Sequence, residues 1–119
     1  MREMGRLTTH VLDISRGAPA AGMRIDLYRG RGPGTALLKT LATNPDGRTD
    51  APLLDEREMA VGDYTIVFHV GGYYREQGHP DAGRFLDEVP VAFTIDERDG
   101  RYHVPLLVSP WSYSTYRGS

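Results

Sequence analysis

YHVPLLVSPWSYSTYRGS, residues 102–119, closes the 119-residue chain and indicates its fold. Apolar and polar side chains alternate along much of this stretch, and successive side chains of a β-strand point to opposite faces. The alternation predicts two strands, over residues 101–109 and 111–116, joined through Pro110. The stretch stays rich in β-forming residues almost to its end, so we expect a chain end that is packed or used rather than frayed.

The first of these strands separates into a core face and an outward face. We expect the core face to carry Tyr102, Val104, Leu106 and Val108. The outward face then carries Arg101, His103, Pro105 and Leu107. The amide side of Pro105 must lie at a sheet edge or a bulge because proline has no N–H. In the second strand Ser112, Ser114 and Tyr116 share one face. The resulting outward surface is semi-apolar, and such surfaces usually meet a ligand or a partner subunit.

The rest of the chain alternates in the same way between frequent turns. The expected strands cover residues 7–14, 23–28, 35–43, 63–70 and 85–96, with a further short strand starting at Arg48 and one short helix over residues 73–77. Turn-forming residues dominate 15–22, 30–34 and 43–49, and residues 53–59 form either a loop or a single helical turn. About eight short strands with one helix predict an all-β sandwich or barrel. We expect a single domain over residues 1–119.

Composition excludes several classes of protein. The chain has 14 lysines and arginines against 16 aspartates and glutamates, and a net charge of −2 gives no electrostatic footprint for nucleic acid. It has no cysteine, which excludes disulfides and thiolate chemistry. No apolar run approaches the ~20 residues of a membrane span, so no membrane association is expected. The N-terminus lacks the apolar segment of a secretory signal, and we therefore expect a cytoplasmic protein.

Two histidines fall on strand faces that point away from the expected core. His10 does so in the strand over residues 7–14, and His103 does so near the chain end. A lone strand histidine is usually solvated or structural, but two such histidines on neighbouring strands would indicate a site. Arg48 follows a rigid turn, where its guanidinium either presents a planar fork to carbonyl and carboxylate oxygens or is simply solvated. We interpret His69 and His79 as structural.

Other combinations of residues carry weaker signals. The four histidines include no pair at i, i+2 or i, i+4 and no carboxylate at ligand spacing, so no metal site is expected. Ser112 and Ser114 lack the G-x-S-x-G surroundings of a serine nucleophile. The glycines of residues 30–34 are not followed by the helix that a phosphate-binding loop requires.

Three blocks of the sequence carry a resemblance to a known family. LTTHVLDISRGAPAAG (residues 7–22), TNPDGR (43–48) and YHVPLLVSPWSYSTYRGS (102–119) resemble, in order and spacing, the signature blocks of the 5-hydroxyisourate hydrolases, purine-degrading members of the transthyretin-like proteins. The closing YRGS is the most specific piece, because hormone-carrying transthyretins resemble this chain in LLVSPWSYST but lack that ending.

The resemblance implies a transthyretin-like sandwich of two four-stranded sheets with one short helix. It also implies a homotetramer, a dimer of dimers, with active sites in a channel lined by the outer faces of the first and last strands. By match to the motifs, the catalytic residues are His10, Arg48 and His103. By the same match, the residues that bind substrate are Ser114, Tyr116, Arg117, Gly118 and Ser119.

The reaction implied by the resemblance is hydrolytic opening of the six-membered ring of 5-hydroxyisourate. Its product is 2-oxo-4-hydroxy-4-carboxy-5-ureidoimidazoline, on the route from urate to allantoin, and no cofactor is expected. Such a ring opening needs a base for the attacking water and positive charge where the oxyanion develops. We assign His103 as the base, His10 to orient the water or relay its proton, and Arg48 to polarise the substrate's carbonyl oxygens. The sequence alone leaves open which histidine is the base.

Two alternatives stand beside this prediction. The first is a non-catalytic transthyretin-like carrier that binds a small aromatic ligand in the same channel. The second is an interaction module that uses the outer sheet face as a protein interface. His10, His103, Tyr116 and the YRGS ending favour the hydrolase, because they make the channel more polar and narrower than an apolar hormone site requires.

Overall fold

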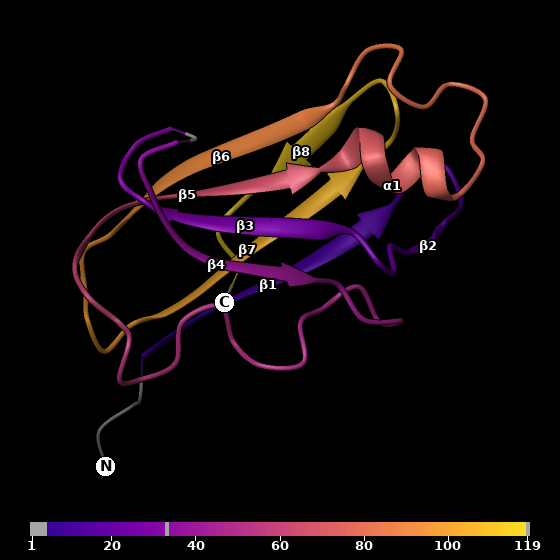
Figure 1. Cartoon of the computed structure of the whole chain (residues 1–119). Helices are drawn as coiled ribbons and strands as arrows, with labels where there is room; N and C mark the ends of the chain where they lie inside the picture. Colours follow the sequence, from indigo (N-terminus) through magenta and orange to yellow (C-terminus); the bar gives the residue numbers. More distant parts are fainter. Residues whose placement is uncertain (1–4, 33, 119) are drawn as a thin grey trace.

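The computed structural model describes residues 5–32 and 34–118, and strands make up most of its regular structure (Figure 1). The elements in order are β1 (Arg6–Asp13), β2 (Ala18–Pro19), β3 (Arg24–Arg29), β4 (Ala36–Ala42), β5 (Gly62–His69), α1 (Val70–Glu76), β6 (Glu88–Ile95), β7 (Arg101–Val108) and β8 (Tyr113–Thr115). They form two four-stranded sheets with strand orders β2-β1-β7-β8 and β4-β3-β5-β6. The predicted all-β sandwich of two four-stranded sheets with one short helix is confirmed. The helix found in the described residues is too short and too polar to cross a membrane.

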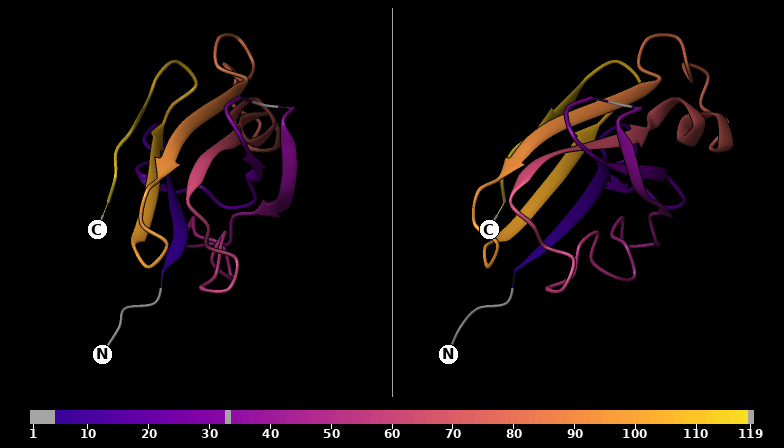
Figure 2. Two further views of the ribbon diagram at one scale, coloured as in Figure 1. Left: turned by 90° about the vertical axis from the view of Figure 1, so that its left-hand side faces the viewer. Right: turned by 60° about the vertical axis from the view of Figure 1, so that its left-hand side comes forward.

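The first and last long strands lie side by side in the first sheet. β1 and β7 are paired in parallel over their full length, with Arg6 opposite Arg101 and Asp13 opposite Val108. The other strand pairs in both sheets are antiparallel. The two layers are seen in Figure 2, where the last residues run back along the side of β7.

The core fills the space between the two layers. The expected core face of β7 is confirmed, since Tyr102, Val104, Leu106 and Val108 are all buried. Leu7 and Val11 of β1 lie on the same inner side and are fully buried. The opposite layer contributes large core side chains, including Ile25, Leu27, Tyr64, Ile66 and Phe68. The alternate positions of β1 and β7 therefore face outward, as their period-two pattern predicts.

Pro105 shows how the first sheet accommodates a proline in an interior strand. The Pro105 carbonyl accepts a hydrogen bond from Thr115 Oγ1 at 2.7 Å, so this residue's backbone groups face β8. β8 ends at Thr115, opposite Leu106, and no strand residue therefore faces the missing N–H. β7 is not an edge strand, since it lies between β1 and β8. The amide side of Pro105 nevertheless lies at a local edge, because β8 ends before the position where an N–H of residue 105 would have to donate.

Several predicted boundaries are wrong. The helix begins at Val70 rather than at residue 73, because Gly71 has no side chain and its N–H bonds Asp87 O at 2.9 Å. The turn region 15–22 contains the two-residue strand β2. No strand follows Arg48 within the described residues, since the Asn44 side chain folds this segment into a turn. For residues 53–59, by contrast, the loop alternative is confirmed, with one tight turn.

Asp13 at the end of β1 anchors the helix to the first sheet. Its side chain is 0% exposed and accepts hydrogen bonds from Tyr73 Oη and Tyr74 Oη, both at 2.8 Å. It also accepts bonds from the backbone N–H and the hydroxyl of Ser15, at 3.1 and 2.6 Å. Burial alone would raise the pKa of Asp13, but the bonds from Ser15, Tyr74 and Tyr73 outweigh it and lower the pKa. The ionised carboxylate is therefore the form that stabilises the fold.

Replacing this carboxylate tests the anchor. Asp13→Asn should lower the free energy of unfolding at pH 7 by about 1–3 kcal/mol, because the two buried tyrosine hydroxyls lose a charged acceptor. Since the folded-state pKa is depressed, the stabilisation is present above the unfolded value of ~3.9 and is lost as the pH falls through the folded value. Urea unfolding at fixed chain concentration should show a weaker acid dependence in the variant. Asp63→Asn, at a partly exposed ion pair, is the control, and equal losses in both variants would contradict the assignment.

Candidate active site

The parallel pairing of β1 with β7 brings His10 and His103 onto one outer sheet face. Thr8 lies directly opposite His103, and His10 lies opposite Pro105. The two histidines are therefore diagonal neighbours, two residues apart along adjacent strands. Both rings are partly buried, in contrast to the fully buried inner face of the same strands. The predicted juxtaposition of two outward histidines is what the fold produces.

The ring and the backbone of His103 are both hydrogen-bonded. Nδ1 lies 2.8 Å from Thr8 Oγ1, and the carbonyl oxygen accepts the N–H of Gly118 at 2.7 Å. Burial, and then electrostatic repulsion from Arg48 and His10, lower the pKa of His103 below its usual value. At neutral pH this imidazole is uncharged, which is the form that can take a proton from water.

His10 is tied to the loop that carries Arg48. Its Nε2 lies 2.9 Å from the carbonyl oxygen of Asp46, and because a carbonyl only accepts, Nε2 is the protonated nitrogen of this pair. The Asn44 side-chain oxygen accepts the backbone N–H groups of Asp46 and Arg48, at 2.9 and 3.1 Å. This turn holds Arg48 close enough to His103 to influence its protonation.

Gly47 lets the loop lie directly against β1. Its φ is +78°, in the left-handed region that favours glycine. Its carbonyl accepts the N–H of Val11 at 2.8 Å. A Cβ built on Gly47 would clash with the Val11 carbonyl oxygen and would lie 3.3 Å from His10 Cδ2. The Asp-Gly pair of the turn is therefore required both for the turn and for the approach of Arg48 to the histidines.

The C-terminal residues continue along β7 after β8 ends. Gly118 pairs with His103 in the same register as β8, and a Cβ on Gly118 would meet His103 Cδ2 at 2.7 Å. The Arg117 guanidinium lies 4.3 Å from the centre of the Tyr102 ring and donates to Arg101 O at 3.3 Å. Tyr116 is 60% exposed. Ser114 is an exposed residue of β8 opposite Leu107, and Ser119 lies outside the described residues.

Two hollows meet at His103. The first has a volume of about 470 Å³, and its lining includes Arg6, Thr8, Arg48, Arg101 and His103. The second is open and is lined by residues of the 97–101 turn, by His103 and by Tyr116, Arg117 and Gly118. Three arginines line the first hollow against one carboxylate, that of Asp50, and this excess of positive charge suits a ligand that carries or develops negative charge. His10 does not line either hollow directly.

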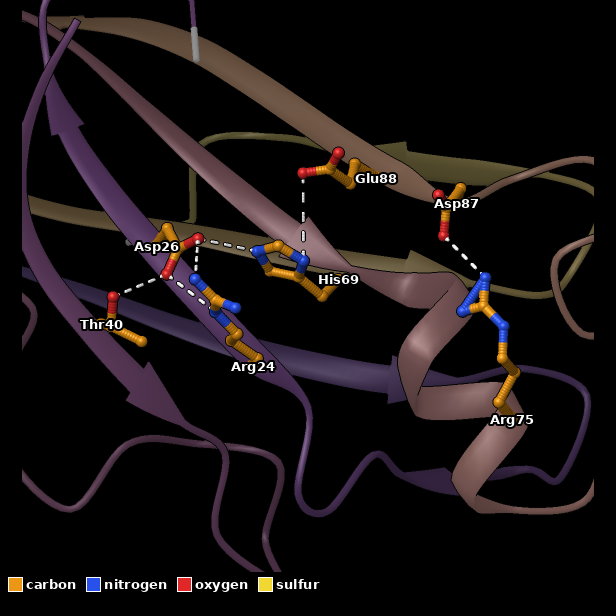
Figure 3. Close-up of polar contacts among 7 residues, drawn as sticks. All are labelled: Arg24, Asp26, Thr40, His69, Arg75, Asp87 and Glu88. Atoms are coloured by element: carbon orange, nitrogen blue, oxygen red, sulfur yellow. Dashed lines mark hydrogen bonds and ion pairs between the residues drawn. The ribbon is translucent and has the colours of Figure 1, made fainter. Parts of the chain in front are cut away.

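The remaining histidines lie elsewhere. His69 ends β5 on the outer face of the second sheet, where its Nε2 is 2.8 Å from buried Asp26, and Arg24 and Thr40 bind the same carboxylate (Figure 3). His79 accepts the Asp81 N–H at 3.1 Å. These contacts fit the structural roles predicted for both. No group of three or more potential metal ligands occurs within residues 5–32 and 34–118.

The sequence placed Thr8 and Arg101 on the outward strand faces but assigned no role to them or to Arg6. Arg6 and Arg101 are opposite each other at the start of the paired strands, and Thr8 contacts the His103 ring. Strand alternation places Arg6 and Thr8 on the His10 side, and that signal was available. Thr8 contacts His103, and Arg6 lies opposite Arg101, only because two strands about 95 residues apart in the sequence pair in parallel. The alternation of side chains within each strand does not indicate that pairing.

Two four-stranded layers with a polar, histidine-bearing outer face define a transthyretin-like sandwich. The model of the HIUase/Transthyretin family matches residues 7–118, and the chain belongs to that family. A similar curated protein is 5-hydroxyisourate hydrolase 2 of Rhizobium meliloti (strain 1021), 53% identical over 121 residues that cover 100% of both chains.

Solved structures show the same fold. A crystal structure of (S)-allantoin synthase is 48% identical with a TM-score of 0.89, and the match covers 99% of this chain but only 45% of the synthase chain. Transthyretin from Sparus aurata is 27% identical with a TM-score of 0.82, and the match covers 95% of this chain and 96% of the transthyretin. The fold is therefore common to proteins with different names, and the residues of the site must distinguish among functions.

The electrostatics of His103 can be tested directly. Arg48→Gln should raise the pKa of His103 toward its ordinary value, because removing a nearby positive charge makes the imidazolium less unfavourable. NMR titration of the histidine ring signals measures this pKa. Arg84→Gln, at an exposed ion pair with Asp81, is the matched control and should leave it unchanged. An unchanged or lowered pKa in Arg48→Gln would show that the guanidinium does not act on this ring.

Proposed function

We propose that this chain catalyses the hydrolysis of 5-hydroxyisourate to 2-oxo-4-hydroxy-4-carboxy-5-ureidoimidazoline. The observation that carries the proposal is the convergence of His10, His103 and the Arg48 loop on one sheet face. The name of the Rhizobium meliloti relative, over the full length of both chains, gives the substrate. The protein is on this basis a cofactor-independent hydrolase that opens a cyclic amide.

His103 acts as the general base of the proposed reaction. Its lowered pKa keeps it neutral, so it can take a proton from water as the water oxygen bonds to a ring carbonyl carbon. The ring C–N bond then breaks as His103 gives its proton to the leaving nitrogen. The carboxylic acid that forms releases its remaining proton to solvent and becomes a carboxylate. Arg48 stabilises the oxyanion of the tetrahedral intermediate. His10, held by Asp46, orients the water or relays the proton.

The chain end completes the proposed substrate pocket. Arg117 and Gly118 are held against β7, next to His103. Exposed Tyr116 borders the second hollow beside them. We assign these residues, together with Ser114 and Ser119, to contacts with the substrate rather than to proton transfer.

The proposed assembly is a homotetramer built as a dimer of dimers. β6 and β8 are edge strands on the same side of the sandwich, and residues of both line an apolar hollow of about 360 Å³ between the layers. Unpaired edges that expose core side chains are suited to pairing with a second copy. The outer face of β1 and β7 then meets a second dimer, which would close the open hollows around His103. A single domain over residues 1–119 and a cytoplasmic location stay predictions.

The carrier function is not favoured. An apolar ligand would cover the three arginines and the one carboxylate, Asp50, that line the first hollow, and removing charged groups from water without new polar partners is unfavourable. The interaction module is not favoured either. A protein interface does not require a neutral, hydrogen-bonded histidine such as His103 at the point where two hollows meet.

The decisive experiment follows the absorbance of freshly made 5-hydroxyisourate. The wild-type chain should accelerate its decay, and His103→Ala should lower turnover about 10²- to 10⁴-fold, the usual contribution of general acid–base catalysis. Light scattering should give the same tetramer mass for both proteins. Decay at the uncatalysed rate with wild-type protein would refute the hydrolase function, and near-wild-type turnover in His103→Ala would refute the base assignment.

A truncation tests the chain end. Removing residues 116–119 should abolish turnover, because it removes the Gly118 partner of His103 and the side chains that border the second hollow. The melting temperature and the tetramer mass should change little, since β8 remains complete. A chain ending at Thr115 that still hydrolyses the substrate would assign these residues a structural role only.

A further inference from the structure

The Thr8 hydroxyl lies against one specific nitrogen of the proposed base. Thr8 Oγ1 is 2.8 Å from His103 Nδ1, and the two residues are directly opposite each other in the β1–β7 ladder. Thr8 is β-branched, so its side chain has few rotamers and the hydroxyl is held where the strand places it. The eight paired positions of β1 and β7 fix the register of this contact.

The opposite edge of the ring is also fixed. Gly118 is so close that an added Cβ would lie 2.7 Å from His103 Cδ2. The ring is therefore held between the Thr8 hydroxyl at Nδ1 and the backbone of the chain end at Cδ2. Nε2 is the remaining ring nitrogen, and His103 lines both hollows where a ligand can enter.

We propose that Thr8 is a positioning residue that accepts the Nδ1–H of His103 and so leaves Nε2 as the unprotonated, proton-accepting nitrogen. This inference rests on the proposed function of His103 as base. A neutral imidazole carries one N–H, and the partner of one nitrogen decides which nitrogen is free. With the opposite tautomer the Thr8 hydroxyl would donate to Nδ1, and Nε2–H could not take a proton from water.

The neighbouring threonine provides a matched contrast on the same two strands. Thr9 Oγ1 donates to the Val104 carbonyl oxygen at 2.7 Å, on the buried inner face. Its hydroxyl also bridges β1 and β7, but it contacts backbone rather than the His103 ring. Removing the Thr9 hydroxyl therefore measures how much such a bridge between the strands contributes to stability, while the tautomer of His103 stays unchanged.

The test compares three variants with the wild-type tetramer. Thr8→Val keeps the side-chain shape but removes the acceptor, and it should lower kcat about 10- to 100-fold with KM within about twofold, as is typical when a partner that orients a functional group is lost. Thr8→Ser restores a hydroxyl and should recover most of the activity. Thr9→Val should reduce thermal stability while kcat stays near the wild-type value.

A spectroscopic measurement makes the outcome independent of turnover. NMR with ¹⁵N-labelled histidine should show Nδ1 protonated and Nε2 unprotonated for His103 at neutral pH in the wild type, and a mixture of tautomers in Thr8→Val. The Nε2–H tautomer in the wild type, or an unchanged kcat in folded Thr8→Val, would overturn the proposal. A wild type with the predicted tautomer but no hydrolysis would refute the proposed function and leave the Thr8 contact standing.

Discussion

The parallel pairing of β1 with β7 is the constraint on which the rest of the site depends. Neighbouring parallel strands cannot be joined by a tight turn, and in this chain the whole segment between Asp13 and Arg101 separates the two. That intervening chain builds the second sheet, covers the inner face of β1 and β7 and leaves their outer face free. A single register then places Thr8 beside His103 and His10 one step further along. Slipping that register by one residue would put the two histidines on opposite faces of the sheet and turn one of them toward the core.

The two faces of each strand could be predicted from the sequence, whereas the pairing between strands could not. Alternation correctly put Tyr102 and Val104 inside and His103 outside, because a half-buried strand has an unambiguous period. Alternation left a sandwich and a barrel equally possible, and the family resemblance favoured the sandwich. The resemblance also indicated which of the outward residues belong to the site, which alternation cannot do. The strand expected after Arg48 was wrong because the Asn44 side chain competes for the backbone N–H groups of that segment. The Thr8 contact was not foreseen, since it requires the register of β1 on β7.

The chemistry expected of the site conflicts with the stability of the face that carries it. Arg6 lies directly opposite Arg101, and Arg48 is close enough to His103 to depress its protonation. Like charges placed side by side repel each other, although salt screens this repulsion because Arg6, Arg48 and Arg101 are all exposed. Such an arrangement contributes nothing to folding, but it lowers the affinity of His103 for a proton and favours negative charge in the hollow. Asp13, at the far end of the same strand, shows the opposite design, with a buried charge fully satisfied by hydrogen bonds that stabilise the fold.

His10 and His103 both lie on outward strand faces, so the sequence does not distinguish their roles. Their hydrogen bonds and neighbouring charges do. His10 donates from Nε2 to a loop carbonyl, which ties it to the turn that carries Arg48. His103 has its hydrogen bond at Nδ1, lies deeper in the path of a ligand and is repelled by both Arg48 and His10. Groups whose environments differ in this way can divide the work of an acid–base reaction between them. We propose His103 as the proton acceptor because the hydrogen-bond partners of the two rings differ, a side-chain hydroxyl at His103 and a backbone carbonyl at His10.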